Sequence, residues 1–151
     1  MIRELTAQDA PALAKLLAAQ RPEYLAHFHP FDFNEPTLAR ILADARRDRF
    51  WALCLFGEIV GFFMLRGFDA CYGRPSYGVF IAESAAGRGL ARTSLDFALK
   101  WCAENAVERV FLKVAPDNLR AHALYKKAGF ENIGACPATG HEMLERRAPF
   151  E

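Results

Sequence analysis

The sequence has no apolar run long enough to cross a membrane. Its most apolar stretches, FWALCLF at 50–56 and IVGFFML at 59–65, fall far short of the ~20 residues that a bilayer-spanning helix needs. The opening residues Met1 to Leu5 also carry no apolar signal core. These absences exclude the usual membrane and secreted classes, so we expect a soluble, cytoplasmic protein with no membrane partner.

Cysteines with metal-binding or redox spacing are also missing. The chain has no C-x-x-C pair, and its four histidines add no zinc-like spacing to its four cysteines, Cys54, Cys71, Cys102 and Cys136. We therefore expect no metal ion. Cys54 and Cys102 lie inside apolar patterns, where a free thiol packs as a small hydrophobic group. Unpaired thiols of this kind are typical of the cytosol.

Charge of neither sign is in excess. The chain has 19 basic and 18 acidic residues, which leave a net charge of +1. Because binding to a phosphate backbone needs many uncompensated Lys and Arg side chains, we expect no nucleic-acid partner. The sequence also has no acidic run that would receive a polybasic peptide.

What the chain does have is the composition of one packed core. Of its 151 residues, 52% are hydrophobic and 13 are phenylalanines. A chain of ~100–200 residues usually folds as one domain. No repeat or linker divides the sequence, so we predict a single domain over residues 1–151.

Hydrophobic periodicity predicts a mixed α/β order in that domain. Helices are expected from Thr6 to about Gln20, around Leu38 to Ala45, from about residue 88 to Asn105, and from Asn118 to Gly129. A tight turn is expected at Gly57-Glu58. Strand patterns occur at 1–5, 50–56, 59–65, 76–82, 107–114, 130–135 and about 141–147.

The junction between the strand at 76–82 and the helix after it contains two glycines. Gly87 and Gly89 let backbone N–H groups approach a ligand closely, and the helix N-terminus adds partial positive charge. Arg88 and Arg92 add side chains that bind phosphate. A P-loop is absent, and Arg92 replaces the third glycine of a dinucleotide fingerprint. The turn therefore suits a pyrophosphate, although glycines also serve in ordinary strand-to-helix turns.

Asn118 and Tyr125 form a second candidate site. They are seven positions apart, which places them on one helical face roughly 10 Å apart along the axis. Structural roles also explain both residues: Asn118 as an N-cap and Tyr125 as a half-buried aromatic residue.

Together the two segments resemble the GNAT superfamily of N-acetyltransferases. Its pyrophosphate motif, Q/R-x-x-G-x-G/A, matches here at Gly89 and Ala91, whereas Ala86 stands in the place of Gln or Arg. A second motif, N-x-x-A-x-x-L-Y-x-x-x-G-F, matches at Asn118, Ala121, Leu124, Tyr125, Gly129 and Phe130. The resemblance runs along the whole chain and implies the GNAT-like acyl-CoA N-acyltransferase fold: a single-domain mixed, mostly antiparallel sheet flanked by helices.

The resemblance also implies acetyl-CoA as cosubstrate and assigns residues to it. Backbone amides of Val79, Phe80 and Ile81 would contact the acetyl and pantetheine portion. The pyrophosphate would lie on the turn formed by Gly87, Arg88, Gly89, Leu90, Ala91 and Arg92. Asn118 would lie beside the extended arm of acetyl-CoA. Tyr125 would bind the cofactor and act as general acid toward the coenzyme A thiolate.

The implied reaction is acetyl transfer from acetyl-CoA to a primary amine by direct attack, since Cys71 has no identifiable His partner that would make it a nucleophile. The general base is open. Where some family members have a glutamate, this chain has Lys113, which is no base at its ordinary pKa. Other candidates, by residue type alone, are Glu83, His27, His29 and Asp32. A chain of water molecules is a further candidate.

The acceptor is expected to be a small-molecule or protein amine, selected by residues 21–36 and 67–75. The aromatic side chains of the first segment either line an apolar pocket or pin the loop to the core: Tyr24, Phe28, Phe31 and Phe33. Two alternatives to acetyl transfer are a non-catalytic module that binds acetyl-CoA or coenzyme A, and transfer of a larger acyl group. A homodimer is a further expectation, by analogy with similar folds.

Overall fold

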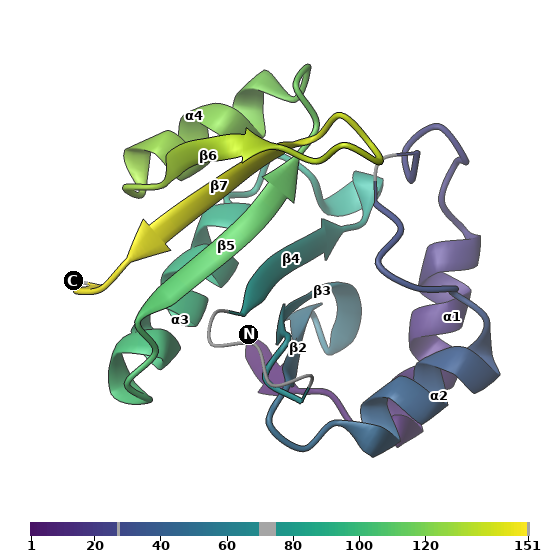
Figure 1. The fold of residues 1–151 in the computed structure, drawn as a ribbon. Helices are drawn as coiled ribbons and strands as arrows, with labels where there is room; N and C mark the ends of the chain where they lie inside the picture. The colour runs from purple at the N-terminus through teal and green to yellow at the C-terminus, as the bar shows by residue number, and fades with distance from the viewer. Residues whose placement is uncertain (27, 70–74, 151) are drawn as a thin grey trace. The chain divides into compact units, whose positions relative to one another are not determined.

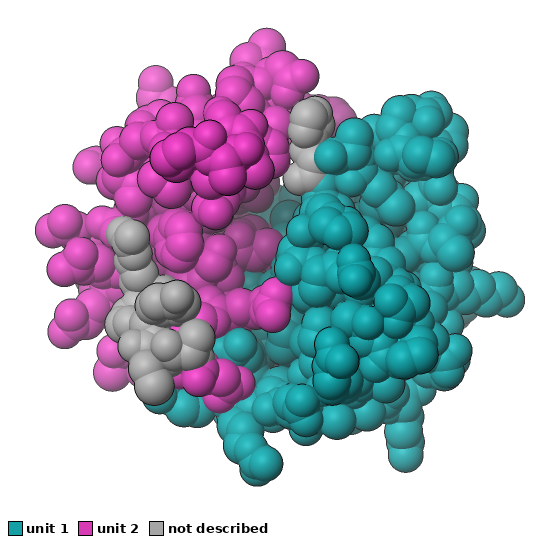
Figure 2. Space-filling model, turned by 45° about the vertical axis from the view of Figure 1, so that its right-hand side comes forward, with its two compact units in different colours: residues 1–64, 79–94 teal, residues 65–78, 95–151 magenta. Residues whose placement is uncertain are grey.

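The computed structural model describes residues 1–26, 28–69 and 75–150 (Figure 1). The chain divides into two compact units, coloured separately in Figure 2. Unit 1 comprises residues 1–64 and 79–94, and unit 2 comprises residues 65–78 and 95–151. The single domain expected from the sequence stays a prediction.

Unit 1 joins a helical pair to a set of strands. The segment predicted as one helix from Thr6 begins as a 3₁₀ turn, where the Asp9 carboxylate accepts the backbone N–H of Thr6 at 2.9 Å. The first strand pairs antiparallel with the next strand along the chain. The elements are β1 (Ile2–Glu4), η1 (Ala7–Asp9), α1 (Ala10–Ala18), α2 (Glu35–Asp44), β2 (Arg49–Leu55), all but the last two residues of β3 (Glu58–Arg66), the end of β4 (Ser76–Ile81), η2 (Glu83–Ala85) and the start of α3 (Leu90–Glu104).

The turn between β2 and β3 lies one residue before the predicted position. Phe56 and Gly57 have φ angles of 52° and 81°, so these two residues, and not Gly57 and Glu58, form the turn. Two successive positive φ angles are typical of the type I′ hairpin turn. Because a bulky residue rarely adopts this conformation, the pattern of residue types did not indicate Phe56.

The core of unit 1 lies between the two helices and the strands. A Cβ atom on Gly61 would overlap the carbonyl oxygen of Phe80, so the glycine allows β3 to approach β4 closely. Fully burying one large apolar side chain stabilises a fold by ~1.5–3 kcal/mol. The buried members of the core are Ala10, Leu13, Leu17, Leu38, Phe50, Phe62, Met64, Phe80 and Ala82.

Unit 2 contains the beginning of β4 and most of α3, followed by β5 (Arg109–Val114), α4 (Leu119–Lys127), β6 (Glu131–Ala135) and β7 (Glu142–Arg147). β4 runs parallel to β5, with Ser76 opposite Phe111. β7 runs antiparallel to both β5 and β6. On α3 the apolar side chains of one face are buried, including Leu95 and Cys102.

The described strands are hydrogen-bonded in the order β1-β2-β3-β4-β5-β7-β6. Antiparallel pairs and one parallel pair occur with helices in the same chain, which confirms the expected mixed, mostly antiparallel α/β class. Cys54 and Cys102 are buried, as predicted. Within the described ranges no helix is both long and apolar enough to cross a membrane.

Candidate functional site

The glycine turn lies entirely in unit 1, between the end of β4 and the start of α3. Gly87 and Gly89 have φ angles of +81° and +75°, a left-handed conformation that glycine adopts without steric cost. The helix was expected from about residue 88 but begins at Leu90, because these two backbone conformations are not helical. Gly89 instead accepts the first helical hydrogen bond, from the N–H of Thr93 at 3.1 Å.

The same turn is open to a ligand. Residues 86–89 are exposed, and a Cβ atom built on Gly87 or Gly89 meets no atom within 4 Å. The first-turn N–H groups of Leu90 and Ala91 have no intrahelical carbonyl partner, as in any α-helix. An exposed backbone of this kind at a helix N-terminus favours an anionic group such as a pyrophosphate.

The predicted acetyl-contacting residues, Val79, Phe80 and Ile81, form the end of β4, also in unit 1. Phe80 is buried in the core, whereas its two neighbours are half-buried. The carbonyl oxygen of Ile81 accepts the hydroxyl hydrogen of Tyr24 at 2.6 Å. The following residue, Ala82, donates its N–H to the carbonyl of Val60 at 2.8 Å.

The second candidate site lies in unit 2 on α4. The Asn118 side chain accepts the N–H of Ala121 at 3.2 Å, so the structural role as N-cap is confirmed. This contact uses the side-chain oxygen and leaves the residue exposed. The cap fixes the residue at which α4 begins.

Tyr125 is more buried than its sequence context suggested. Only 7% of its surface is exposed, and its ring makes edge-to-face contacts with Phe130 at 5.7 Å and Tyr77 at 6.4 Å between centroids. Burial raises the pKa of the Tyr125 hydroxyl to about 12. Among the described residues every fully buried side-chain oxygen has a hydrogen-bond partner. The Tyr125 hydroxyl is therefore either hydrogen-bonded or accessible to solvent.

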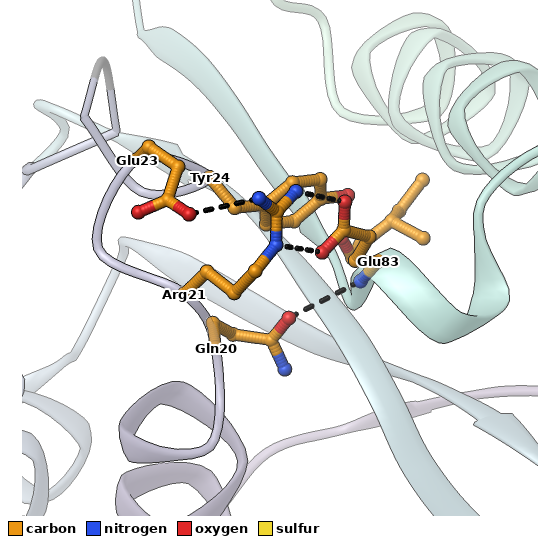
Figure 3. Close-up of polar contacts among 6 residues, drawn as sticks. Gln20, Arg21, Glu23, Tyr24 and Glu83 are labelled. Carbon is orange, nitrogen blue, oxygen red and sulfur yellow. Dashed lines mark hydrogen bonds and ion pairs between the residues drawn. The ribbon is translucent and has the colours of Figure 1, made fainter.

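Glu83 is unsuited to the role of general base. Its two carboxylate oxygens pair with the guanidinium of Arg21, one of them through Nε at 2.9 Å (Figure 3). The hydrogen bond from Arg21 holds the pKa of the Glu83 carboxyl below its ordinary value. A carboxylate stabilised in its ionised form has little tendency to take a proton from an ammonium group.

Two of the other base candidates contact each other. His29 and Asp32 form an exposed pair, with Nε2 and Oδ1 3.5 Å apart. His27 and Cys71 lie outside the described residues. Lys113 is exposed on β5, opposite Met143 of β7.

The aromatic segment after α1 packs on the core of unit 1. The ring of Phe28 lies 5.9 Å from that of Phe62 and 5.8 Å from that of Phe80, and it stacks on Phe33 at 5.9 Å. Tyr24 makes an edge contact with Phe80 at 6.3 Å. Of the two roles left open by the sequence, these contacts support the one in which the rings pin the loop to the core.

Two features of unit 2 had no signal in the sequence. On α4, His122 lies one turn before Tyr125, with Nδ1 3.3 Å from Glu142 and Nε2 3.1 Å from the carbonyl of Ala115. In the β6–β7 turn, hydrogen bonds from the Thr139 hydroxyl and nearby backbone lower the pKa of the Cys136 thiol to about 7. Both depend on contacts between distant or irregular segments, which residue spacing does not indicate.

Comparison with known proteins adds a family and a set of similar folds. Residues 12–130 match the profile of the Acetyltransferase (GNAT) family. The uncharacterized N-acetyltransferase YjgM of Escherichia coli K12 is 29% identical over 156 aligned positions, which cover 97% of this chain and 92% of YjgM.

Two solved structures illustrate the similarity of fold. Ribosomal-protein-alanine N-acetyltransferase from Brucella melitensis superposes with a TM-score of 0.78 at 21% identity, covering 98% of this chain and 99% of that one. PaiA N-acetyltransferase from Thermoplasma acidophilum, solved in complex with coenzyme A, gives a TM-score of 0.76 at 15% identity, with 98% of each chain covered. At these identities the likeness establishes the fold alone.

Proposed function

Because the chain belongs to the acetyltransferase (GNAT) family, we propose that it transfers an acetyl group from acetyl-CoA to a primary amine by direct attack of that amine. Family membership supports acetyl transfer in general; the amine acceptor and the direct mechanism are specific to the proposal. The observation that carries it is the open glycine turn ahead of α3. The alternative, a module that only binds acetyl-CoA or coenzyme A, is less favoured because it needs no hydroxyl group at the position of Tyr125.

The glycine turn would hold the pyrophosphate of acetyl-CoA. Gly87 and Gly89 present open backbone, and the first turn of α3 adds N–H donors and partial positive charge. The coenzyme A bound to the Thermoplasma relative supports the same cosubstrate here. When bound, acetyl-CoA supplies the activated acetyl group as a thioester.

The backbone of Val79–Ile81 would orient the acetyl group. N–H donors held in advance by a strand stabilise the negative charge that develops on an attacked carbonyl oxygen, and each such donor is worth about 3 kcal/mol. The strand is suited to this because Phe80 anchors it in the core and Ala82 bonds to β3. The donors therefore need no rearrangement during the reaction.

Tyr125 would donate a hydrogen bond to the leaving sulfur. An ordinary thiol has a pKa of about 8.5, whereas burial raises the pKa of Tyr125 to about 12. Complete proton transfer to the sulfur would be uphill by about 3.5 pKa units, or about 5 kcal/mol. The hydroxyl therefore stabilises the departing sulfur mainly while keeping its own proton.

In this proposal water takes both protons that the acceptor nitrogen loses, one from the ammonium group before attack and one as the amide forms, and the departing coenzyme A thiolate takes up a proton from water. Glu83 is held in its ionised form by Arg21, and Lys113 has the wrong charge for a base. An alkylammonium group has a pKa of about 10.4, so only a small fraction is ready to attack at neutral pH. The acceptor itself is a small-molecule or protein amine. We propose that the enzyme acts on it in the cytoplasm.

The proposal is tested by following loss of the thioester of acetyl-CoA in the presence of primary amines. The panel includes alkylamines and a peptide that begins with alanine. Chromatography is the suitable detection, because it separates acetyl-CoA from coenzyme A and from the N-acetylated amine without a thiol reagent. We expect amine-dependent loss of the thioester and formation of the N-acetylated amine.

The variant Tyr125→Phe distinguishes catalysis from binding. It keeps the buried ring, so the Kd for acetyl-CoA and the unfolding temperature should stay unchanged, while kcat falls by at least about tenfold. An unchanged kcat would remove Tyr125 from the mechanism. Tight binding of acetyl-CoA with no consumption on any amine would contradict transfer and favour the binding module.

A further inference from the structure

Three contacts tie the segment after α1 to the end of β4 and the start of η2, and both sides belong to unit 1 (Figure 3). Arg21 forms a two-point ion pair with the carboxylate of Glu83. The side-chain oxygen of Gln20 accepts the backbone N–H of Glu83 at 3.2 Å. The Tyr24 hydroxyl donates to the carbonyl of Ile81 at 2.6 Å. We call Gln20, Arg21, Tyr24, Ile81 and Glu83 the clasp.

The clasp joins two segments with separate proposed roles. Its contacts link residues 57, 62 and 63 positions apart in the sequence. Residues 21–24 form the beginning of the segment 21–36, which is expected to select the acceptor, and Gln20 directly precedes it. On the other side, Ile81 ends the strand proposed to orient the acetyl group, and Glu83 lies four positions before Gly87.

The contacts of the clasp fix the orientation of the two segments more than they stabilise the fold. The Arg21 and Glu83 side chains are 58% and 44% exposed, and an ion pair so open to solvent contributes little to the free energy of unfolding. A planar guanidinium that bonds both carboxylate oxygens nevertheless fixes their relative orientation. Arg21 is itself directed by a further contact with Glu23 at 2.8 Å. The contacts therefore order the segment more than they stabilise the fold.

We propose that Arg21 and Tyr24 are positioning residues, which hold the acceptor segment on the strand that orients the acetyl group. Neither residue touches the cofactor in this role. When acetyl-CoA orders residues 79–92, the clasp passes that order to residues 20–26. The inference rests on the proposed function, because it assigns the cofactor to the first segment and the acceptor to the second.

Hydrogen–deuterium exchange of the full chain, with and without acetyl-CoA, tests the clasp. In the unaltered protein, acetyl-CoA should slow exchange both in residues 79–92 and in residues 20–26. In Arg21→Gln the slowing should persist at 79–92 and disappear at 20–26. Glu83→Gln should behave in the same way, and the double variant should lose nothing more, because both changes break one ion pair.

A matched control is available in the same unit. Arg3 and Asp9 form another two-point pair, with distances of 2.9 and 3.0 Å, that takes no part in the clasp. Arg3→Gln should therefore retain the slowing in both segments. Tyr24→Phe keeps the aromatic ring and removes only the hydroxyl, so it should lose part of the slowing at 20–26 even if Arg21→Gln proves poorly folded.

The outcomes separate this inference from the proposed function. If acetyl-CoA failed to slow exchange at 79–92 in the unaltered protein and in every variant, this result would contradict the cofactor site itself. Slowing at 20–26 that survives unchanged in Arg21→Gln and Tyr24→Phe would overturn the clasp alone. The Kd for acetyl-CoA should rise by less than about fivefold in Arg21→Gln, because an exposed ion pair outside the cofactor site has little effect on binding. A larger rise would mean that Arg21 binds the cofactor directly, and would overturn its role as a positioning residue.

Discussion

Burial sets the chemistry of Tyr125 at the scale of the single residue. Its ring lies between those of Tyr77 and Phe130, with 7% of the residue exposed. Because the phenolate would lose its hydration in this environment, the pKa rises to about 12. The side chain is therefore neutral throughout the physiological range and available as a hydrogen-bond donor.

This pKa predicts a specific loss of stability at alkaline pH. In the unfolded chain the hydroxyl ionises at a pKa near 10, and in the folded protein only near 12. Above about pH 10 the unfolded state thus binds fewer protons than the native state, so the free energy of unfolding falls as pH rises through this window. The loss from Tyr125 is about 2 kcal/mol at pH 12 and approaches about 3 kcal/mol above it, from two pKa units.

The measurement is denaturant unfolding from about pH 9 to about pH 12, on the natural protein and on Tyr125→Phe. The variant has no hydroxyl to ionise, so its stability should fall less steeply over the same window. Other groups titrate equally in both proteins and cancel in the difference. Parallel curves would show that Tyr125 ionises as readily in the folded protein as in the unfolded chain.

The motif that resembles the GNAT family selected Asn118 and Tyr125 as candidate site residues, whereas nothing in the sequence described the contacts of Glu83. The first two residues belong to one helix, where a separation of seven places them on one face. Glu83 depends on Arg21, which is 62 positions away and belongs to a segment without periodic structure. An exposed ion pair leaves no pattern in the sequence, so only the folded chain could reveal that the pair makes Glu83 a poor base.

At the scale of the element, the connection between β4 and α3 is the main feature of the site. Two glycines in left-handed conformations turn the chain before Leu90 begins the helix. Neither glycine is needed to avoid a clash, since a Cβ atom on either would meet nothing within 4 Å. Their requirement is therefore conformational, and the space above them is available to a ligand.

Gly89→Ala should separate the conformational cost of this turn from its function. Placing alanine at a φ of +75° should cost ~1 kcal/mol of stability and weaken acetyl-CoA binding, because the turn shifts toward other conformations. Gly140 in the β6–β7 turn has the same φ of +75° and equally open space. Gly140→Ala should therefore show the same loss of stability with an unchanged Kd.

Thermal unfolding and calorimetric titration of the two variants give both quantities. Equal weakening of acetyl-CoA binding in both variants would assign the effect to general destabilisation. An unchanged Kd in Gly89→Ala would show that the turn is only a connection between two elements.

Hydrophobic period identified the elements better than their ends. Each predicted strand and helix is present, because alternating and 3.6-residue patterns reflect the burial of one face. The misplaced positions all involve backbone conformations that residue type constrains weakly. Phe56 adopts a positive φ without being glycine, and the two glycines of the cofactor turn delay the start of α3 by about one half-turn.

At the scale of the whole molecule, composition and motifs indicated the class of protein and its cosubstrate. The family profile covers residues 12–130, which include both motifs that carried the resemblance. The strand residues 79–81 and the glycine turn belong to unit 1, whereas Asn118 and Tyr125 belong to unit 2. The acceptor was beyond reach of the sequence, because the loops expected to select it have no regular pattern.

Thermal unfolding of the purified protein with and without acetyl-CoA tests the central claim most directly. A ligand present at about a hundred times its Kd adds about 2.7 kcal/mol to the free energy of unfolding. For a chain of this size the unfolding temperature should rise by roughly 5–10 °C. A rise of this order would establish the binding of acetyl-CoA on which the proposed reaction depends. An unchanged unfolding temperature at millimolar acetyl-CoA would contradict the cofactor site, and the proposed transferase activity with it.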